Sequence, residues 1–86
     1  MAERAITFAR SARRELERLE RPIAARIFDR IEALADDPRP PGSRKLHGRN
    51  AYWRLRVGDY RVLYGVDDEK GVIDIVAIGH RRDIYR

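Results

Sequence analysis

The sequence YWRLRVGDYRVLY, residues 52–64, decides the fold of this 86-residue chain. Apolar and polar side chains alternate on both sides of Gly58-Asp59, and a period of two is typical of β-strands with one buried face. Glycine at the first position of a two-residue turn favours a tight hairpin. We therefore predict two antiparallel strands, Ala51–Val57 and Tyr60–Val66.

A two-residue turn also fixes which residues face each other. Val57 pairs with Tyr60, Arg56 lies opposite Arg61, and directly opposed residues share a face of the sheet. The predicted apolar face, expected to pack against helices, carries Trp53, Leu55, Val57, Tyr60, Val62 and Tyr64. The predicted polar face carries Tyr52, Arg54, Arg56 and Arg61. A three-residue loop would break this register.

The three arginines on the polar face need an explanation, because like charges directly opposite each other destabilise a sheet. A bound polyanion is the simplest one: phosphates would reverse the repulsion, and Tyr52 could stack on a base. The alternative is that each arginine pairs with a carboxylate, with Asp59 and Asp74 as the candidates.

The chain before the hairpin is expected to hold one strand and two helices. Ala5–Arg10 alternates like a strand, and Ser11 can cap a helix that continues to Leu19. Pro22 suits the first turn of a second helix. Its apolar stripe consists of Ile23, Ile27, Phe28, Ile31 and Leu34. The proline-rich segment Asp36–Ser43 predicts a loop.

After the hairpin, Asp67–Gly71 is expected to form a turn and Val72–Ile78 a third strand, ended by Gly79. The predicted fold class is therefore α+β. A short N-terminal strand and a two-helix hairpin precede an antiparallel meander of three strands. The helices cover one face of the sheet and the other face can stay open. Residues 1–86 are expected to form a single domain.

Composition narrows the function classes. The net charge is +5, and all 19 basic residues except Lys45 and Lys70 are arginines. Residues 44–61 contain Asp59 as their only acidic side chain. Such a basic segment suggests nucleic acid, an acidic partner or a membrane surface. The plain alternative is a solvated surface in a protein from an arginine-preferring genome.

Other features exclude several kinds of site. The chain has no Cys, so disulfides and zinc–thiolate sites are excluded, and a cytoplasmic location is permitted. No apolar run is long enough for a transmembrane helix, and the first thirty residues are too charged for a signal peptide. His47 and His80 give no metal-ligand spacing, and no phosphate-binding glycine loop or nucleophile elbow is present.

The C-terminal segment, residues 79–86, adds Arg81 and Arg82 together with two side chains that can move protons, His80 and Tyr85. Read singly, His80 is a surface histidine and Tyr85 a packing residue. A functional role for either requires that the third strand end beside the arginines.

Three motifs together resemble the RelE branch of the RelE/ParE toxin superfamily. They are KLHG at residues 45–48, the hairpin at 52–64, and IGHRRDIY at 78–85. The likeness spans the whole chain, since the order of strands and helices also fits. The motifs of the second half are specific in combination, whereas the helical half is generic.

The resemblance implies an endoribonuclease that enters the ribosomal A site and cleaves mRNA by attack of a 2′-hydroxyl on the adjacent phosphate, without a metal or cofactor. It implies that Arg61 and Arg81 bind and neutralise the scissile phosphate, with Tyr85 stacking on a base or assisting proton transfer. Arg54 and Arg56 match two further basic positions. Around them, RNA contacts are expected from Lys45, Arg49, Tyr52 and Arg82.

One departure from the family changes the expected chemistry. The best-known RelE toxins carry lysine at the positions of Arg54 and Arg56, where it has been assigned proton transfer. Arginine titrates above ~12 and is a poor general base. We therefore expect Arg54 and Arg56 to act electrostatically, and Tyr85 or His80 to carry the proton.

The resemblance also implies partners and leaves alternatives. The expected partners are a cognate RelB-like antitoxin, acidic or partly disordered, and the mRNA and ribosomal RNA of the A site, with no membrane. One alternative is a ParE-like toxin that poisons DNA gyrase without nuclease activity; Arg61, Arg81 and Tyr85 together favour the RelE branch. A second is a non-catalytic RNA-binding module.

Overall fold

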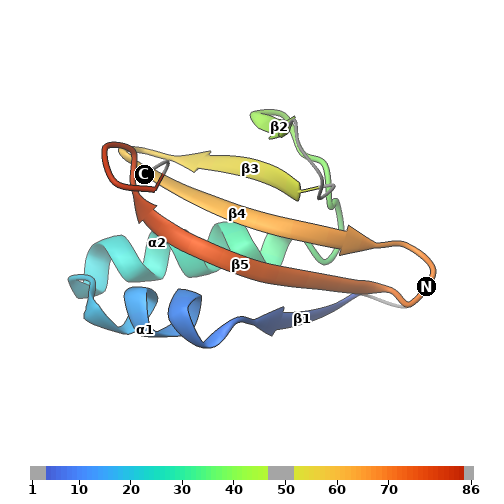
Figure 1. Ribbon diagram of the computed structural model, residues 1–86, viewed down its shortest axis with the longest axis horizontal. Coiled ribbons are helices and arrows are strands. Elements are labelled where there is room, and N and C mark those ends of the chain that lie inside the picture. The colour runs from blue at the N-terminus through green and yellow to red at the C-terminus, as the bar shows by residue number, and fades with distance from the viewer. Residues whose placement is uncertain (1–3, 47–51, 85–86) are drawn as a thin grey trace.

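The computed structural model describes residues 4–46 and 52–84 of the chain. In chain order its elements are β1 (Ala5–Phe8), α1 (Arg10–Arg18), α2 (Arg21–Ala33), β2 (Ser43–Lys45), β3 (Tyr52–Val57), β4 (Tyr60–Asp67) and β5 (Val72–His80). They form one sheet in the order β1-β5-β4-β3-β2, with both helices on one of its faces (Figure 1). Strand β1 runs parallel to β5, and the other neighbours are antiparallel. The α+β class and the helix-covered sheet are confirmed, with one strand more than predicted.

The first strand passes directly into the first helix. The Ala9 N–H donates to the Ile75 carbonyl at 2.8 Å, and the Ala9 carbonyl accepts from Arg13 N–H at 3.0 Å. Ala9 therefore makes the last hydrogen bond between β1 and β5 and directly precedes the first residue of α1. The predicted strand to Arg10 is two residues too long, and the predicted cap at Ser11 is wrong: Ala9 is the N-cap residue, with no side-chain cap bond.

The second helix begins as predicted, with Pro22 in its first turn, where a missing N–H costs no hydrogen bond. Ile27, Ile31 and Leu34 of the predicted stripe are fully buried. Phe28 is the exception, with 42% of its surface exposed. No described helix is both long enough and apolar enough to span a membrane.

The core lies between the helices and the covered face of the sheet. The helical layer contributes Ala12, Ile27, Ile31 and Leu34, and the sheet contributes Leu55, Val57, Val62, Tyr64, Ile73, Ile75 and Ile78. The hairpin residues in this core are members of the predicted apolar face. The predicted register is confirmed throughout, from Val57↔Tyr60 to Trp53↔Tyr64, with Arg56 opposite Arg61.

A bulge in β5 explains how three isoleucines with uneven spacing all reach the core. Ile78 pairs with Val62 and Ile75 pairs with Tyr64, so the register shifts by one residue between Leu63 and Tyr64. An extra residue in one strand of an antiparallel pair changes which side chains point to a given face. Without the bulge, Ile75 and Ile78 would lie on opposite faces.

In the second half of the chain one strand was not predicted, and β4 and β5 end later than predicted, β4 by one residue at Asp67. Ser43, expected to be the last residue of the loop, instead begins β2 (Ser43–Lys45), which pairs with β3 at the sheet edge. Strand β5 continues through Gly79 to His80, because Gly79 pairs with Arg61 and His80 with Tyr60 on β4. Gly79 therefore does not end the strand.

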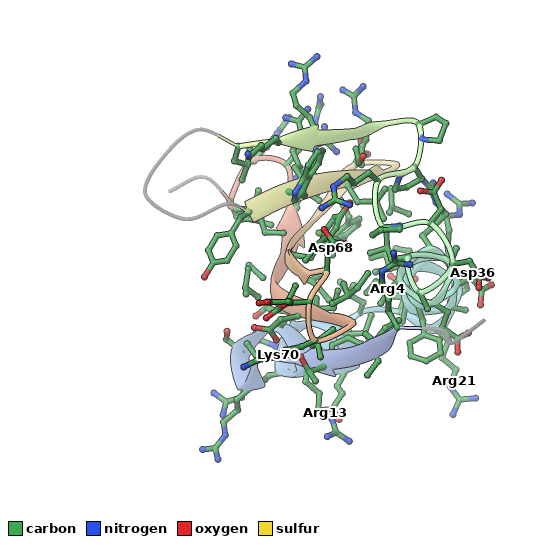
Figure 2. All side chains as sticks on the ribbon, turned by 90° about the vertical axis from the view of Figure 1, so that its right-hand side faces the viewer. Arg4, Arg13, Arg21, Asp36, Asp68 and Lys70 are labelled. Carbon is green, nitrogen blue, oxygen red and sulfur yellow. The ribbon has the colours of Figure 1, made fainter. Side chains whose placement is uncertain are left out.

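The proline-rich loop is fastened to the sheet by polar contacts. The buried Tyr64 hydroxyl donates to the Pro38 carbonyl at 2.8 Å, and burial raises the pKa of Tyr64 above its ordinary value. The Arg39 guanidinium lies over the Trp53 ring at 5.3 Å and donates to Asp68 at 2.9 Å. Arg4 adds a second, longer ion pair to Asp68 at 3.9 Å, and the two labelled side chains lie together in Figure 2.

Candidate functional site

Four arginines share the open face of the sheet, the face away from the helices. In the β2–β3 register Arg44 lies opposite Arg54, and in the β3–β4 register Arg56 lies opposite Arg61. Alternation along β3 places Arg54 and Arg56 on the same side. We call Arg44, Arg54, Arg56 and Arg61 the arginine face. The sequence predicted three of its members together and the structure brings those three together.

Arg44 is the member that sequence reasoning missed. Its neighbour Lys45 was expected to contact RNA, but Lys45 lies opposite Trp53, and Trp53 packs against the core. The β2 register therefore gives Arg44, and not Lys45, to the arginine face. The sequence feature that could have indicated this is the basic pair Arg44-Lys45. Successive residues of a strand point to opposite faces, so once β2 pairs with β3 one of the two must point to the open face.

Arg61 is the most deeply buried of the four. Only 6% of its surface is exposed, and its Nη1 donates to the carbonyls of Gly58 and Tyr60 at 3.0 and 2.9 Å. Both carbonyls belong to the hairpin turn region, so the two-residue turn itself orients the guanidinium. Arginine has five N–H donors, and these two bonds use only those of Nη1.

Three members of the arginine face form no ion pair with a carboxylate of the described residues. None of the ion pairs within residues 4–46 and 52–84 involves Arg44, Arg56 or Arg61. Of the two acids considered in the sequence, Asp59 pairs with Arg81, and Asp74 accepts a hydrogen bond from Thr7 at 2.8 Å. The pairing explanation for the opposed arginines therefore fails for Arg56 and Arg61.

The C-terminal segment folds back to the hairpin turn. The Arg81 N–H donates to the Asp59 carbonyl at 2.8 Å, and Arg81 Nε lies 3.8 Å from Asp59 Oδ1. The Arg81 side chain keeps 54% of its surface exposed. Ile84 packs over Gly79, where an added Cβ would lie 3.5 Å from it. Since Gly79 pairs with Arg61, the segment brings Arg81 to the edge of the arginine face.

His80 is not brought to the arginine face. It pairs with Tyr60, and the two rings meet edge to face with centroids 5.5 Å apart. Tyr60 packs against the core, so this pair lies on the helix side of the sheet, opposite to Arg61. The His80 Nδ1 accepts from the Arg82 N–H at 3.2 Å, within the tight turn that follows β5.

The remaining predicted residues divide in two groups. Tyr52 lies on the open face opposite Gly65, and Arg82 is exposed in the turn after β5. Arg49, Tyr85 and His47 lie outside the described residues.

The chemistry available on this surface is electrostatic. Closely spaced guanidinium groups bind phosphate oxygens and stabilise extra negative charge on phosphorus. No group of three or more His, Cys, Asp or Glu side chains suited to hold a metal occurs in the part of the chain that the structure describes. The residues gathered here therefore fit an RNA or DNA backbone.

Comparison with known proteins agrees with this architecture. A family model described as "ParE toxin of type II toxin-antitoxin system, parDE" matches residues 6–85. The chain is 33% identical over 82 residues to Toxin RelG of Mycobacterium tuberculosis, covering 94% of each chain.

Two solved structures have the same fold. One is the RelBE2 toxin–antitoxin complex of Mycobacterium tuberculosis, with a TM-score of 0.80, 29% identity, and coverage of 93% of this chain and 100% of that one. The other is the archaeal RelE–RelB complex of Pyrococcus horikoshii, with a TM-score of 0.83, 25% identity, and coverage of 95% and 99%.

The helix-backed sheet of this chain is thus the fold of a class of small toxins found in type II toxin–antitoxin systems. This chain belongs to the RelE/ParE toxin superfamily, as the resemblance of its hairpin and C-terminal motifs indicated.

Proposed function

We propose that this toxin is a ribosome-dependent endoribonuclease that cleaves mRNA in the A site and so inhibits translation. The observation that carries the proposal is the arginine face. It is a cluster of arginines on the face of the sheet away from the helices, with Arg56 and Arg61 opposed and no described carboxylate paired to either. The relatives named RelG and RelE, at 33% and 30% identity, support the RelE type of activity.

In the proposed reaction, an mRNA 2′-hydroxyl attacks the adjacent phosphorus, the bond to the 5′-oxygen breaks, and the products are a cyclic phosphate and a 5′-hydroxyl end. One proton leaves the 2′-oxygen and one reaches the departing 5′-oxygen. Negative charge grows on the phosphoryl oxygens. Arg61 and Arg81 stabilise that charge, and Arg54 and Arg56 hold the neighbouring backbone.

The proton carrier is assigned to Tyr85. Arginine does not give up a proton near neutral pH, and the His80 ring lies against Tyr60 on the helix side. Tyr85 matches the C-terminal tyrosine of the RelE motif at residues 78–85. Arg82, Arg49 and Lys45 are assigned to RNA contacts around the site, Lys45 from the edge strand and not from the arginine face.

The proposed partners are an antitoxin and the ribosome, and the proposed location is the cytoplasm, where translation occurs. Several solved relatives are complexes of a RelE toxin with RelB, including the archaeal one. A basic toxin surface suits an acidic, partly disordered antitoxin segment. The proposed reaction uses the 2′-hydroxyl of the RNA as the nucleophile, so it calls for no cofactor.

A test uses the purified chain and a defined mRNA with and without programmed ribosomes. The expected result is cutting within the A-site codon, with 5′-hydroxyl ends, only when ribosomes are present. Intact mRNA under both conditions would contradict the proposal.

A second candidate is poisoning of DNA gyrase, favoured by one observation: the matching family model carries the ParE name. This activity would need no cleavage chemistry at the arginine face. A gyrase supercoiling assay separates the candidates, since inhibition of supercoiling together with intact mRNA supports only the ParE type.

A further inference from the structure

A second feature of the open face lies at the other end of the sheet. An open pocket of about 470 Å³ is lined there by Thr7, Tyr52, Gly65, Lys70 and Asp74, among others. Figure 2 looks at this end of the molecule, with Lys70 in the turn between β4 and β5. Four of these residues form one row across the sheet: Tyr52 pairs with Gly65, Gly65 with Asp74, and Asp74 with Thr7.

The row provides an aromatic surface for a flat ligand. A Cβ added to Gly65 would lie 3.5 Å from two atoms of the Tyr52 ring. The ring therefore lies next to the backbone of Gly65, which has no side chain. Any larger residue at Gly65 would fill the floor of the pocket. Aromatic side chains on an open sheet stack on nucleobases, whichever base is present.

Asp74 adds a preference among bases. Its Oδ1 accepts from the Thr7 hydroxyl at 2.8 Å, which fixes the carboxylate in the pocket wall. No ion pair of the described residues uses Asp74. An ionised carboxylate only accepts hydrogen bonds, so it selects ligands whose edge donates them.

We propose that this pocket binds one base of the RNA strand whose phosphates lie on the arginine face, and that it prefers guanine. The Watson–Crick edge of guanine offers two adjacent N–H donors to a carboxylate. Adenine and cytosine offer one amino group each, and uracil offers a single N–H between two carbonyl oxygens that the carboxylate repels. Uracil is therefore the least favoured base.

The pocket is within reach of the same strand. Tyr52 and Arg54 point to the same side of β3, two residues or about 7 Å apart. The inference rests on the proposed function only in taking RNA as the ligand. The sequence predicted that Tyr52 contacts RNA. The proposal makes this contact specific: Tyr52 binds one base of the RNA in a pocket that it forms together with Thr7, Gly65 and Asp74.

The test measures binding without cleavage. Fluorescently labelled RNA pentamers, 2′-O-methylated so that no strand can be cut, carry G, A, C or U between flanking uridines. Their dissociation constants from the full chain are measured by anisotropy without ribosomes. The G pentamer should bind about 5- to 100-fold more tightly than the U pentamer.

Three variants locate the preference. Asp74→Asn should remove the difference between G and U, and Tyr52→Ala should weaken the G pentamer about 5- to 100-fold. Glu69→Gln, a matched charge change in the adjacent turn outside the pocket lining, should keep the difference. Circular dichroism establishes that each variant is folded.

Equal binding of all four pentamers by the parent chain, or an unchanged preference in folded Asp74→Asn, would overturn the inference. These outcomes are distinct from failure of the proposed nuclease. A chain that prefers the G pentamer and leaves mRNA intact on ribosomes would contradict the nuclease and retain the base site.

Discussion

The two faces of the β3–β4 hairpin consist of alternate residues of the same two strands. One face packs against the helices and stabilises the fold, whereas the other carries the arginines of the candidate site. On the covered face Leu55, Val62 and Tyr64 are fully buried against the helices. On the open face the paired residues are Arg56 and Arg61. Each position on the covered face contributes to stability by removing apolar surface from water. The repulsion between the opposed arginines lowers the stability of the sheet, and the same arrangement concentrates positive charge that can bind an anion.

The largest expected difference between the two sides of the molecule is in mRNA cleavage. Replacing Arg61 and Arg81 together by alanine removes the groups assigned to the scissile phosphate. Mutations that remove one such donor cost about 10²- to 10³-fold, so the pair should lower mRNA cleavage on ribosomes by at least ~10³-fold. The matched control is Arg14→Ala with Arg30→Ala, which removes two exposed charges from the helical layer. Equal activity of the two double variants would contradict the assignment.

Neighbouring residues on β3 test the division between the faces directly. Leu55→Ala leaves a cavity in the core and should lower the free energy of unfolding by about 2–5 kcal/mol. Arg56→Ala should change it by less than ~0.5 kcal/mol, since Arg56 is exposed and its repulsion with Arg61 is relieved. Urea unfolding of both variants gives the comparison. A large loss for Arg56→Ala would show that the arginine face is structural.

The proton carrier is tested by two single changes and their combination. Tyr85→Phe should lower cleavage about 100-fold, the smaller end of the range for a lost acid or base. His80→Ala should have a far smaller effect, because its ring lies with Tyr60 on the helix side. The measurement is single-turnover cleavage on programmed ribosomes. A double variant with unchanged cleavage would rule out both residues.

On the covered side, one hydroxyl ties the proline-rich loop to the sheet. Tyr64→Phe removes the donor to the Pro38 carbonyl and leaves that acceptor buried, which should cost about 1–3 kcal/mol of unfolding free energy. Tyr52→Phe, on the open face, is the control and should cost less than ~0.5 kcal/mol. Equal losses would remove the contrast between the two tyrosines.

The smallest expected effect is one of pH. The hydrogen bond from Arg39 holds the pKa of Asp68 below its ordinary value of 3.8. Asp68 therefore stabilises the fold above pH 3.8, and this contribution is lost as pH falls through the lowered pKa. The carboxylate is exposed, so the effect is small. In thermal unfolding, Asp68→Asn should lose less stability than the parent chain on going from neutral pH to below 3.8. An identical loss in both chains would contradict this.

Local chemistry made the hairpin predictable from the sequence. Gly58 adopts a φ of +60°, which favours glycine, and the two-residue turn then fixes every pair along both strands. Pro22 similarly placed the start of α2. Where a turn residue or the spacing of apolar side chains specifies the backbone conformation, the element can be predicted from the local sequence.

Other features depend on contacts between distant segments. Strand β2 is three residues long and polar, so only its partner β3 reveals it. The bulge in β5 and the extension of that strand to His80 follow from pairing with β4. These long-range pairings decide that Arg44 joins the arginine face, while Lys45 and His80 do not.

The most direct test of the central claim, that the open arginine face cuts mRNA, is a map of mRNA 5′ ends in bacteria expressing this chain. The same map is made for Arg61→Ala with Arg81→Ala. Growth arrest with new 5′ ends inside translated codons, absent from the double variant, is the predicted result. Growth arrest with intact mRNA would contradict the claim and point to gyrase.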